Sequence, residues 1–328
     1  MNKINVAVIG VGNIGKHHAR IYHENDKCNL LAICDRDRKR AIKTAKKYNC
    51  SFFTDYEEMF NEKEINAVSI AVPTFEHEKV ALKAFEYECH TLIEKPIAYS
   101  IKSAKKIINE AKKKNLILMI GHVERFNPAV IKAKRIIEKG EIGNIISMNS
   151  TRVGLFPPTI DRENVIFDLA IHEFDIYNFI LNKKPQKILA MSGSPLNNNI
   201  QDYAEILINY GDTIANIHVN WLTPVKIRKL CINGSKGYLE LDYINQEITI
   251  YKTNLDITEF KDFKDFLKLS KQSSKKNIAI KYKEPLKEEI KNFLASIKNK
   301  QNPLISGEEG LSALEIAIEA TKCCTNFQ

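Results

Sequence analysis

A glycine-rich turn between an apolar strand and a helix constrains the fold of this chain more than any other feature. Residues Ile4–Ile9 form a continuous apolar run, Gly10–Gly15 has the spacing G-x-G-x-x-G, and a helical pattern covers residues 14–24. The glycine spacing alone is common, but its place after a buried strand and before a helix makes it specific. The segment therefore predicts the first strand–helix unit of a parallel sheet.

The next hundred residues continue the alternation of strand and helix, and Asp55 is placed to cap a short helix. Apolar strands are expected at Leu30–Cys34, Ser51–Phe53, Ala67–Val72, Thr91–Ile93 and Leu116–Ile120, with helices at Glu76–Glu88 and Ile101–Lys114. Near-continuous apolar strands that alternate with helices are typical of a parallel sheet covered on both faces. We therefore expect a doubly wound α/β domain of the Rossmann type over residues 1–121.

The pattern changes after Gly121. Alternating strands are expected at residues 145–152, 204–209, 214–220, 229–232, 238–241 and 247–251, and helices at 128–139, 168–181, 286–297 and 309–322. Such alternation indicates an open, mostly antiparallel sheet with one covered face. Residues 122–328 are predicted to form this α+β domain, with the lysine-rich stretch 252–283 as an irregular excursion. The uncovered face predicts a homo-oligomer, either a dimer or a tetramer.

Charge and composition exclude several classes of protein. The net charge of +9 favours anionic partners. No basic run carries interleaved aromatic residues, so a nucleic acid is not expected, and a phosphorylated small molecule fits the charge equally well. No apolar run reaches the ~18 residues of a membrane span, and the first ten residues are too short for a signal peptide. The seven cysteines include no C-x-x-C pair, which argues against a metal site. We expect a cytoplasmic protein with no membrane contact and free thiols.

The glycine turn supplies the chemistry for binding a dinucleotide. Gly10 allows the tight turn, Gly12 lets the backbone approach a pyrophosphate, and Gly15 lets the helix pack closely on the strand. The start of the helix, with Asn13 and Ile14 in the turn, presents N–H groups and positive partial charge to the phosphates.

Asp35 ends the second predicted strand, twenty positions after Gly15. A carboxylate at this point accepts hydrogen bonds from the ribose 2′-hydroxyl and repels a 2′-phosphate, which favours NAD over NADP. Arg36 and Arg38 oppose this interpretation, because a guanidinium close by could receive that phosphate.

Glu94-Lys95-Pro96 follows the fifth predicted strand. Ligands bind beyond the carboxyl ends of the strands in a doubly wound sheet, so this charged pair is expected beside the nicotinamide. The proline favours an extended Lys95 and raises the frequency of a cis peptide bond. Without that context, a strand end followed by a turn explains the same three residues.

Asp168, His172 and Asp175 are spaced for one face of a helix. A carboxylate one turn from an imidazole can fix its tautomer and stabilise its protonated form, as a general base requires. Taken in isolation, the pair is better explained by a helix cap at Asp168 and a core histidine at His172. No further cluster of histidine or cysteine supports a metal.

Together these motifs resemble the Gfo/Idh/MocA family of oxidoreductases. The matching segments are Gly10–Gly15, Ala71-Val72-Pro73-Thr74 with His77, Glu94-Lys95-Pro96, Asp168–His172 and Glu284-Pro285-Leu286. The resemblance implies that Lys95 and His172 carry proton transfer and that Asp168 assists them. It implies NAD contacts from Gly10, Gly12, Asn13, Ile14, Gly15, Asp35, Arg36, Pro73, Thr74, His77, Glu94 and Lys95.

Two further segments, 121–128 and 220–228, are similar to the branch of the family that acts on UDP-N-acetylated sugars. That resemblance implies NAD-dependent oxidation of the C3 hydroxyl of UDP-N-acetylglucosamine or its uronic acid. The 3-keto product would then serve a PLP-dependent aminotransferase. Where relatives often have Gly-Pro-Phe-Pro, this chain has Gly154-Leu155-Phe156-Pro157-Pro158, so the resemblance does not carry the substrate contacts of that loop over to this chain.

Several side chains are candidates for holding such a substrate. Arginine matches phosphate geometry and an indole can stack on a ring, although each of these residues could equally be structural. The candidates are Arg125, Asn127, Arg152, Trp221 and Arg228. Two other functions stay open: the same chemistry on a free polyol such as inositol or glucose, and a regulator that senses NAD without turnover. The intact Lys95, Asp168 and His172 argue against the regulator.

Overall fold

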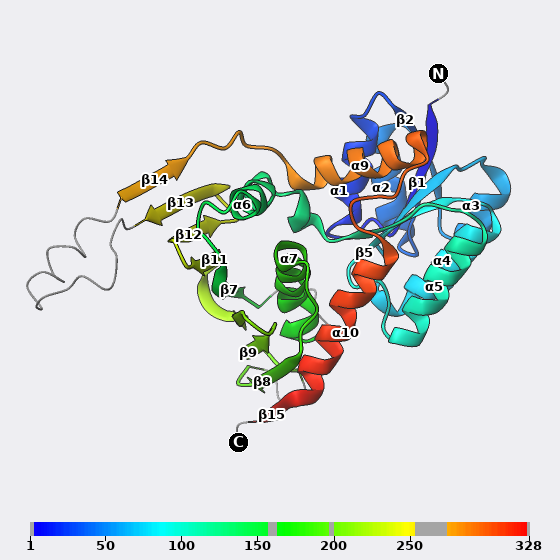
Figure 1. Cartoon of the computed structure of the whole chain (residues 1–328). Helices are drawn as coiled ribbons and strands as arrows, with labels where there is room; N and C mark the ends of the chain where they lie inside the picture. Colours follow the sequence, from blue (N-terminus) through cyan, green and yellow to red (C-terminus); the bar gives the residue numbers. More distant parts are fainter. Residues whose placement is uncertain (1–2, 157–162, 197–199, 253–273, 327–328) are drawn as a thin grey trace, which may run out of the picture. The chain divides into compact units, whose positions relative to one another are not determined.

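The computed structural model describes residues 3–156, 163–196, 200–252 and 274–326. Within it the chain forms two compact units, each with its own sheet (Figure 1). Unit 1 consists of Met1–Val123 with Glu284–Glu315, and unit 2 consists of Glu124–Lys283 with Ile316–Gln328. None of the described helices is both long enough and apolar enough to cross a membrane.

Unit 1 contains a six-stranded sheet in which all strand pairs are parallel, in the order β3-β2-β1-β4-β5-β6. The strands are β1 (Ile4–Ile9), β2 (Cys28–Cys34), β3 (Ser51–Phe53), β4 (Ala67–Ile70), β5 (His90–Glu94) and β6 (Leu118–Gly121). The helices between them are α1 (Gly15–His23), α2 (Arg38–Tyr48), α3 (Tyr56–Glu62), α4 (His77–Glu86) and α5 (Ile101–Lys113). The predicted doubly wound domain is confirmed. Its strand order reverses between β1 and β4, where such sheets bind ligands.

Two later helices differ from the sequence prediction in their placement. α9 (Pro285–Asn299) and the first part of α10 (Gly307–Cys323) lie in unit 1, whereas the prediction assigned all residues after 121 to the second domain. The reason is packing, because α9 contacts α1 and buries Phe293. In the same unit, side chains of β6 and α5 lie against Gly307, so a Cβ there would come 2.7 Å from Ile108 Cγ1.

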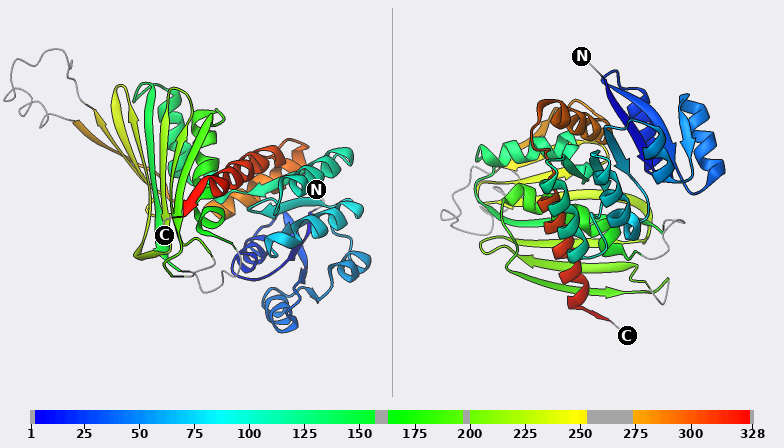
Figure 2. Two further views of the ribbon diagram at one scale, coloured as in Figure 1. Left: turned by 90° about the horizontal axis from the view of Figure 1, so that it is seen from below. Right: turned by 90° about the vertical axis from the view of Figure 1, so that its right-hand side faces the viewer.

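Unit 2 contains a nine-stranded sheet in the order β14-β13-β12-β11-β7-β10-β9-β8-β15. The strands are β7 (Ile145–Leu155), β8 (Lys187–Gly193), β9 (Tyr203–Asn209), β10 (Ile214–Asn220), β11 (Leu222–Gly234), β12 (Gly237–Asp242), β13 (Glu247–Lys252), β14 (Ser274–Ile278) and β15 (Cys324–Asn326). Only the described pairs β7–β10 and β8–β15 are parallel, so the mostly antiparallel sheet is confirmed. Figure 2 shows these strands side by side as one layer.

Helix α6 (Pro128–Glu138) packs against β12 and β13, and a helical segment of residues 166–181 lies near β7 and β10. The opposite side of the sheet carries exposed apolar residues, as the alternation predicts. Among them are Leu189, Met191, Leu207 and Ile214.

The structure also corrects the strand list in unit 2. β8, β14 and β15 were not predicted, and β11 begins at Leu222 rather than at Lys229. The register of β11 against β7 shifts between Leu222 and Ile227, which breaks the alternation that a sequence interpretation needs. Most of the predicted excursion, residues 253–273, lies outside the described residues.

Candidate active site

The glycine turn in unit 1 has the shape of a phosphate cradle. Gly10 has φ +85°, and a Cβ there would lie 2.6 Å from the Ala71 carbonyl oxygen. A Cβ on Gly15 would lie 1.8 Å from the Gly10 carbonyl oxygen. Around Gly12, in contrast, the nearest side-chain atom would be 3.8 Å away, so this part of the turn has room for a ligand.

The start of α1 has the electrostatics that an anion needs. The N-cap residue Ile14 provides no side-chain hydrogen bond, and the first turn contains no acidic residue. The first N–H groups of a helix then point outward with positive partial charge. Asn13 and Ile14 lie in this turn, so the residues present fit a dinucleotide pyrophosphate.

Asp35 lies directly beside the glycine turn and is buried. Its Oδ2 accepts a hydrogen bond from the Val11 N–H at 2.9 Å, and its Oδ1 accepts one from the Asp37 N–H at 2.9 Å. These bonds hold the carboxylate at the end of β2, where the position of the ribose is expected.

The arginine that contacts Asp35 is one that the sequence analysis missed. Arg40 Nη1 lies 3.3 Å from Asp35 Oδ2, whereas Arg36 pairs with Glu76 and Arg38 lies over a phenylalanine ring. Asp37 caps α2 by accepting a hydrogen bond from the Arg40 N–H, so Arg40 lies in the first turn of that helix. The spacing of a cap residue and the residue three positions later is the signal that could have found it.

The Glu94-Lys95-Pro96 segment contains a cis peptide bond between Lys95 and Pro96. Glu94 ends β5, and its carboxylate contacts His18 Nε2 at 2.9 Å. The structure thus places Glu94 toward the protein interior, next to Lys95 in the chain.

His77 links two loops at the carboxyl edge of the sheet. Its Nδ1 lies 3.0 Å from the Pro96 carbonyl oxygen, and its Nε2 lies 3.0 Å from the Val72 carbonyl oxygen. Pro73 and Thr74 follow Val72 at the start of a short 3₁₀ turn. The buried imidazole therefore holds the loop after β4 to the loop after β5, which is a positioning role toward any ligand bound there.

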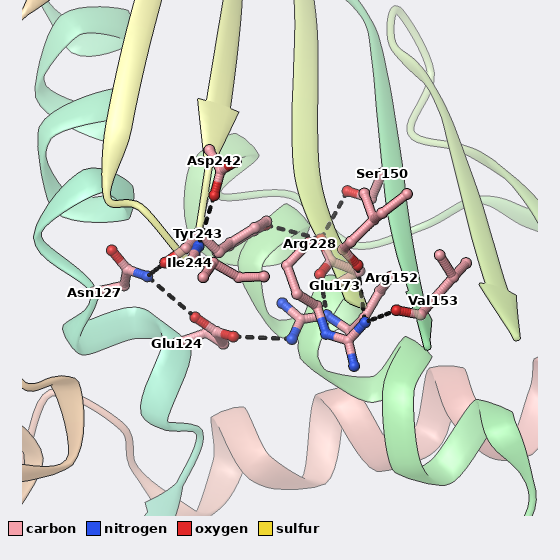
Figure 3. A network of polar contacts seen from close by, with 11 residues as sticks. Glu124, Asn127, Ser150, Arg152, Val153, Glu173, Arg228, Asp242, Tyr243 and Ile244 are labelled. Carbon is pink, nitrogen blue, oxygen red and sulfur yellow. Dashed lines mark hydrogen bonds and ion pairs between the residues drawn. The ribbon is translucent and has the colours of Figure 1, made fainter. Parts of the chain in front are cut away.

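In unit 2, a fully buried glutamate organises a polar network (Figure 3). Glu173 accepts hydrogen bonds from Ser150 Oγ at 2.7 Å, from the Tyr243 hydroxyl at 2.8 Å and from Arg152 Nε at 2.6 Å. Arg152 Nη1 also pairs with Glu124 at 2.9 Å. Burial opposes the charge on Arg152, but Glu173 and Glu124 outweigh it and raise the pKa of this guanidinium. Two carboxylates therefore neutralise Arg152 within the network.

Arg228 lies beside this network under different electrostatics. Its Nη1 donates hydrogen bonds to the carbonyl oxygens of Val153 and Ile227, and among the described residues it forms no ion pair with a carboxylate. Burial and the charge of Arg152 lower the pKa of Arg228 to about 10. A desolvated cation of this kind favours an anionic ligand.

Asp168 is close enough to Arg228 for its negative charge to raise the pKa of that guanidinium, which partly opposes the effect of burial. Trp221 Nε1 donates a hydrogen bond to Asp168 Oδ2 at 3.3 Å, and the Trp221 side chain is only 2% exposed. Phe156 packs edge-on against the indole with ring centroids 5.1 Å apart. Unit 2 therefore brings together Asp168, Trp221 and Arg228, all of which the sequence analysis named as site residues. Trp221 is packed in the core and donates a hydrogen bond to Asp168.

The backbone at Asp168 departs from the predicted helix. Residues Ile166–Ala170 form a π-helix, and the α-helix α7 begins only at Ile171 and ends at Leu181. A π-helix bonds from i to i+5, so Asp168 and His172 do not follow the α-helical spacing assumed from the sequence. Both side chains are half-buried. Single π-helical turns are frequent at functional sites, which agrees with a functional role for Asp168.

Arg125 and Asn127 have structural positions in unit 2. Arg125 forms a two-bond ion pair with Asp175 at 2.8 and 2.7 Å, with the two side chains 3% and 1% exposed. Asn127 caps α6 by accepting a hydrogen bond from the Ala129 N–H, and its amide donates to the Tyr243 carbonyl oxygen at 2.9 Å. Arg125 thus ties the segment before α6 to α7, and Asn127 ties the start of α6 to the turn after β12.

The Arg125–Asp175 pair gives a testable effect on stability. We expect Asp175→Asn to lower the free energy of unfolding by about 3–5 kcal/mol, because it leaves a buried guanidinium without its carboxylate. Chemical denaturation followed by circular dichroism would measure this. Glu110→Gln is the matched control, since it removes the partner of the exposed Lys113 and should change stability by less than about 1 kcal/mol. Equal stability of the two variants would contradict the structural role.

Comparison with protein-family models identifies both parts of the chain. Residues 4–122 match the model described as "Oxidoreductase family, NAD-binding Rossmann fold", and residues 130–240 match the "GFO/IDH/MocA C-terminal domain". The chain belongs to the Gfo/Idh/MocA family of oxidoreductases. Its first unit is an NAD-binding Rossmann domain, so the predicted cofactor and family are confirmed.

Individual relatives agree on the fold and differ in the substrate that they name. UDP-N-acetylglucosamine 3-dehydrogenase of Acidithiobacillus ferrooxidans is 27% identical over 76% of this chain and 78% of its own length. Its solved structure superposes with a TM-score of 0.86 and covers 99% of this chain and 98% of that one, at 25% identity. Myo-inositol 2-dehydrogenase of Thermotoga maritima is 24% identical over 97% of this chain and 95% of its own length. A levoglucosan dehydrogenase solved with NADH and levoglucosan has a TM-score of 0.85 at 18% identity, covering 98% and 97% of the two chains, which supports the fold alone.

Proposed function

We propose that this oxidoreductase transfers hydride from the C3 carbon of a UDP-N-acetylated hexose to NAD, giving the 3-keto sugar. The substrate would be UDP-N-acetylglucosamine or its uronic acid. The observation that carries the proposal is Arg228, a partly buried cation with no carboxylate ion pair among the described residues, in the neighbourhood of Asp168. The similarity to a UDP-N-acetylglucosamine 3-dehydrogenase supports the same substrate class.

The arginines of unit 2 divide by their charge balance. Arg125 is neutralised by Asp175, and Arg152 by Glu173 and Glu124. Arg228 has the charge that a diphosphate needs, and arginine can bind it through two parallel hydrogen bonds. We therefore assign the nucleotide diphosphate to Arg228. Arg152 would act through its network, and Trp221 by orienting Asp168.

The proposed chemistry balances as a two-electron oxidation. NAD, when bound, supplies the hydride acceptor. The C3–H bond breaks with its electron pair, the hydroxyl proton moves to the His172 imidazole, and a C=O bond forms. We assign stabilisation of the developing alkoxide to the Lys95 ammonium, and orientation of His172 to Asp168. The opposite assignment, with Lys95 as the base, uses the same residues.

Two partners belong to the proposal. A 3-keto sugar is a substrate for transamination, so a PLP-dependent aminotransferase would consume the product. A second copy of the chain would cover the exposed apolar side of the unit 2 sheet, which includes Leu189, Met191 and Leu207.

A free polyol is the second candidate substrate. The myo-inositol 2-dehydrogenase relative is nearly as similar in identity and spans more of the chain. A polyol carries no diphosphate, so under this alternative the charge of Arg228 would be irrelevant to binding.

The test is NADH formation with a panel of UDP-N-acetylglucosamine, its uronic acid, free N-acetylglucosamine and myo-inositol. We expect turnover only with the UDP-sugars. Arg228→Met should raise KM for the UDP-sugar about 10- to 100-fold, the loss of a charge-assisted hydrogen bond of ~1.5–3 kcal/mol. Lys229→Met is the matched control, because it removes the same charge from the next, exposed residue of β11.

Each other outcome has a defined meaning. Turnover of myo-inositol without turnover of UDP-sugars would show that the substrate is a free polyol and not a UDP-sugar. NAD binding without turnover of any member of the panel would favour a regulator. An equal effect of the two methionine variants would remove Arg228 from the substrate site.

A further inference from the structure

A series of buried polar side chains in unit 1 ends at Glu94. The Tyr22 hydroxyl contacts Ser69 Oγ at 2.8 Å, Ser69 Oγ contacts His18 Nδ1 at 3.0 Å, and His18 Nε2 contacts Glu94 Oε1 at 2.9 Å. Tyr22, Ser69 and His18 are completely buried, and the Glu94 side chain is 15% exposed. These contacts connect Tyr22 of α1 to Glu94, the residue before Lys95.

Each hydrogen bond in this series has one donor and one acceptor when the His18 imidazole is neutral. An ionised Glu94 only accepts, so His18 Nε2 carries the hydrogen and Nδ1 accepts from Ser69. Ser69 Oγ then accepts from Tyr22, whose pKa is raised by burial, so that its hydroxyl stays protonated. A charged imidazole would leave one of the two hydroxyl hydrogens without an acceptor among the described contacts.

Glu289 of α9 is a third titratable group at this place. It is completely buried, and one oxygen of Glu289, one oxygen of Glu94 and a ring nitrogen of His18 all lie within 4.8 Å of one another. Two carboxylates this close repel each other when both are ionised, and such pairs can retain one proton between them. A proton shared by this pair would lie on Glu289, because Glu94 contacts His18 Nε2.

Glu94 is also enclosed from the neighbouring strand. It pairs with Gly121 of β6, and a Cβ at Gly121 would lie 3.1 Å from the Glu94 carboxyl carbon. The side chain is thus held by His18 at its end and by β6 at its side. Only one peptide bond separates this restrained residue from Lys95, so its position determines where the backbone of Lys95 begins.

We propose that Glu94, held by His18 beside a protonated Glu289, is the positioning residue for the Lys95 ammonium. This inference rests on the proposed catalytic role of Lys95. His18 and Glu289 act only through Glu94, and none of the three takes up the substrate proton.

The first experiment measures kcat, KM and NAD affinity of His18→Leu and His18→Gln with the substrate that the panel identifies. We expect His18→Leu to lower kcat roughly 10²-fold, the size of a small misplacement of a catalytic group, with NAD affinity and KM nearly unchanged. His18→Gln should recover much of kcat, because its amide can donate to Glu94. His23→Leu on the exposed side of α1 is the matched control and should keep wild-type kcat. Circular dichroism of each variant would establish that it folds.

The second experiment detects the proton on the Glu289 carboxyl group and does not depend on catalytic turnover. The infrared difference spectrum of the NAD-free protein minus Glu289→Gln should contain the C=O stretch of a protonated carboxylic acid. Its absence would overturn the assignment of the proton to Glu289. Wild-type kcat in His18→Leu would overturn the positioning role, provided that Lys95→Met has lost activity. If Lys95→Met itself retained full activity, the proposed function of Lys95 would be wrong instead.

Discussion

Replacing Asp35 with asparagine is expected to change the cofactor preference from NAD to NADP. The substitution keeps the shape of the side chain and removes the charge that repels a 2′-phosphate. It also releases Arg40, whose Nη1 lies 3.3 Å from Asp35 Oδ2. We expect NADP affinity to rise at least about tenfold and NAD affinity to fall about tenfold, from the ~1.5–3 kcal/mol of hydrogen bonds to a charged group. Fluorescence titration with both cofactors would measure this.

The role of Arg40 in that change can be separated from the role of charge alone. Asp35→Asn combined with Arg40→Met should lose the gained NADP affinity, because the guanidinium that receives the phosphate is gone. Asp35→Asn combined with Arg38→Met should keep it, since Arg38 lies over the Phe52 ring. Tighter binding of NADP than of NAD by the unaltered protein would contradict the role given to Asp35.

Lys95→Met and His172→Ala are each expected to lower kcat by about 10²–10⁴-fold. The reason is the loss of the alkoxide-stabilising cation in one variant and of the general base in the other. NAD affinity should change little in His172→Ala, because the glycine turn, Asp35 and Lys95 are unaltered. NADH formation with the UDP-sugar measures kcat, and Lys105→Met on the exposed side of α5 is the control for loss of a lysine charge.

The double variant tests whether the two residues serve one step. Groups that act as a unit give non-additive losses, so Lys95→Met with His172→Ala should be little worse than the more severe single variant. Losses that multiply would place the two residues in separate steps. Near wild-type kcat in both single variants would remove them from the chemistry.

Local patterns in the sequence suffice to predict the glycine turn and the class of each sheet. The strand, turn and helix around Gly10–Gly15 depend on backbone sterics within one short segment, so the residues of that segment determine them. The class of each sheet follows from hydrophobic periodicity, which is also local. The sequence analysis missed β14 and β15, which are short strands at the two edges of the sheet and carry weak periodic signals. It also missed β8, an interior strand of seven residues whose alternation of buried and exposed residues could have revealed it.

The candidate site depended more strongly on tertiary structure. The sequence analysis placed Arg36 and Arg38 near the ribose. In the structure, α2 begins after the Asp37 cap and directs Arg40 to Asp35 instead. The sequence analysis named three arginines for phosphate, and the structure showed that two of them are balanced by carboxylates many residues away in the chain. Such partners are known only once distant segments have packed.

By itself, the sequence determined the NAD-binding turn and the two sheet classes, because each is encoded by steric or periodic rules over a few neighbouring residues. The family followed from the resemblance of several motifs along the chain, which the family models confirm. Only the tertiary structure decided that α9 returns to unit 1, that Asp168 lies in a π-helix against Trp221, and that His18 and Glu289 meet at Glu94. Burial and charge balance are properties of the assembled core, so residue types and spacing could not reveal them.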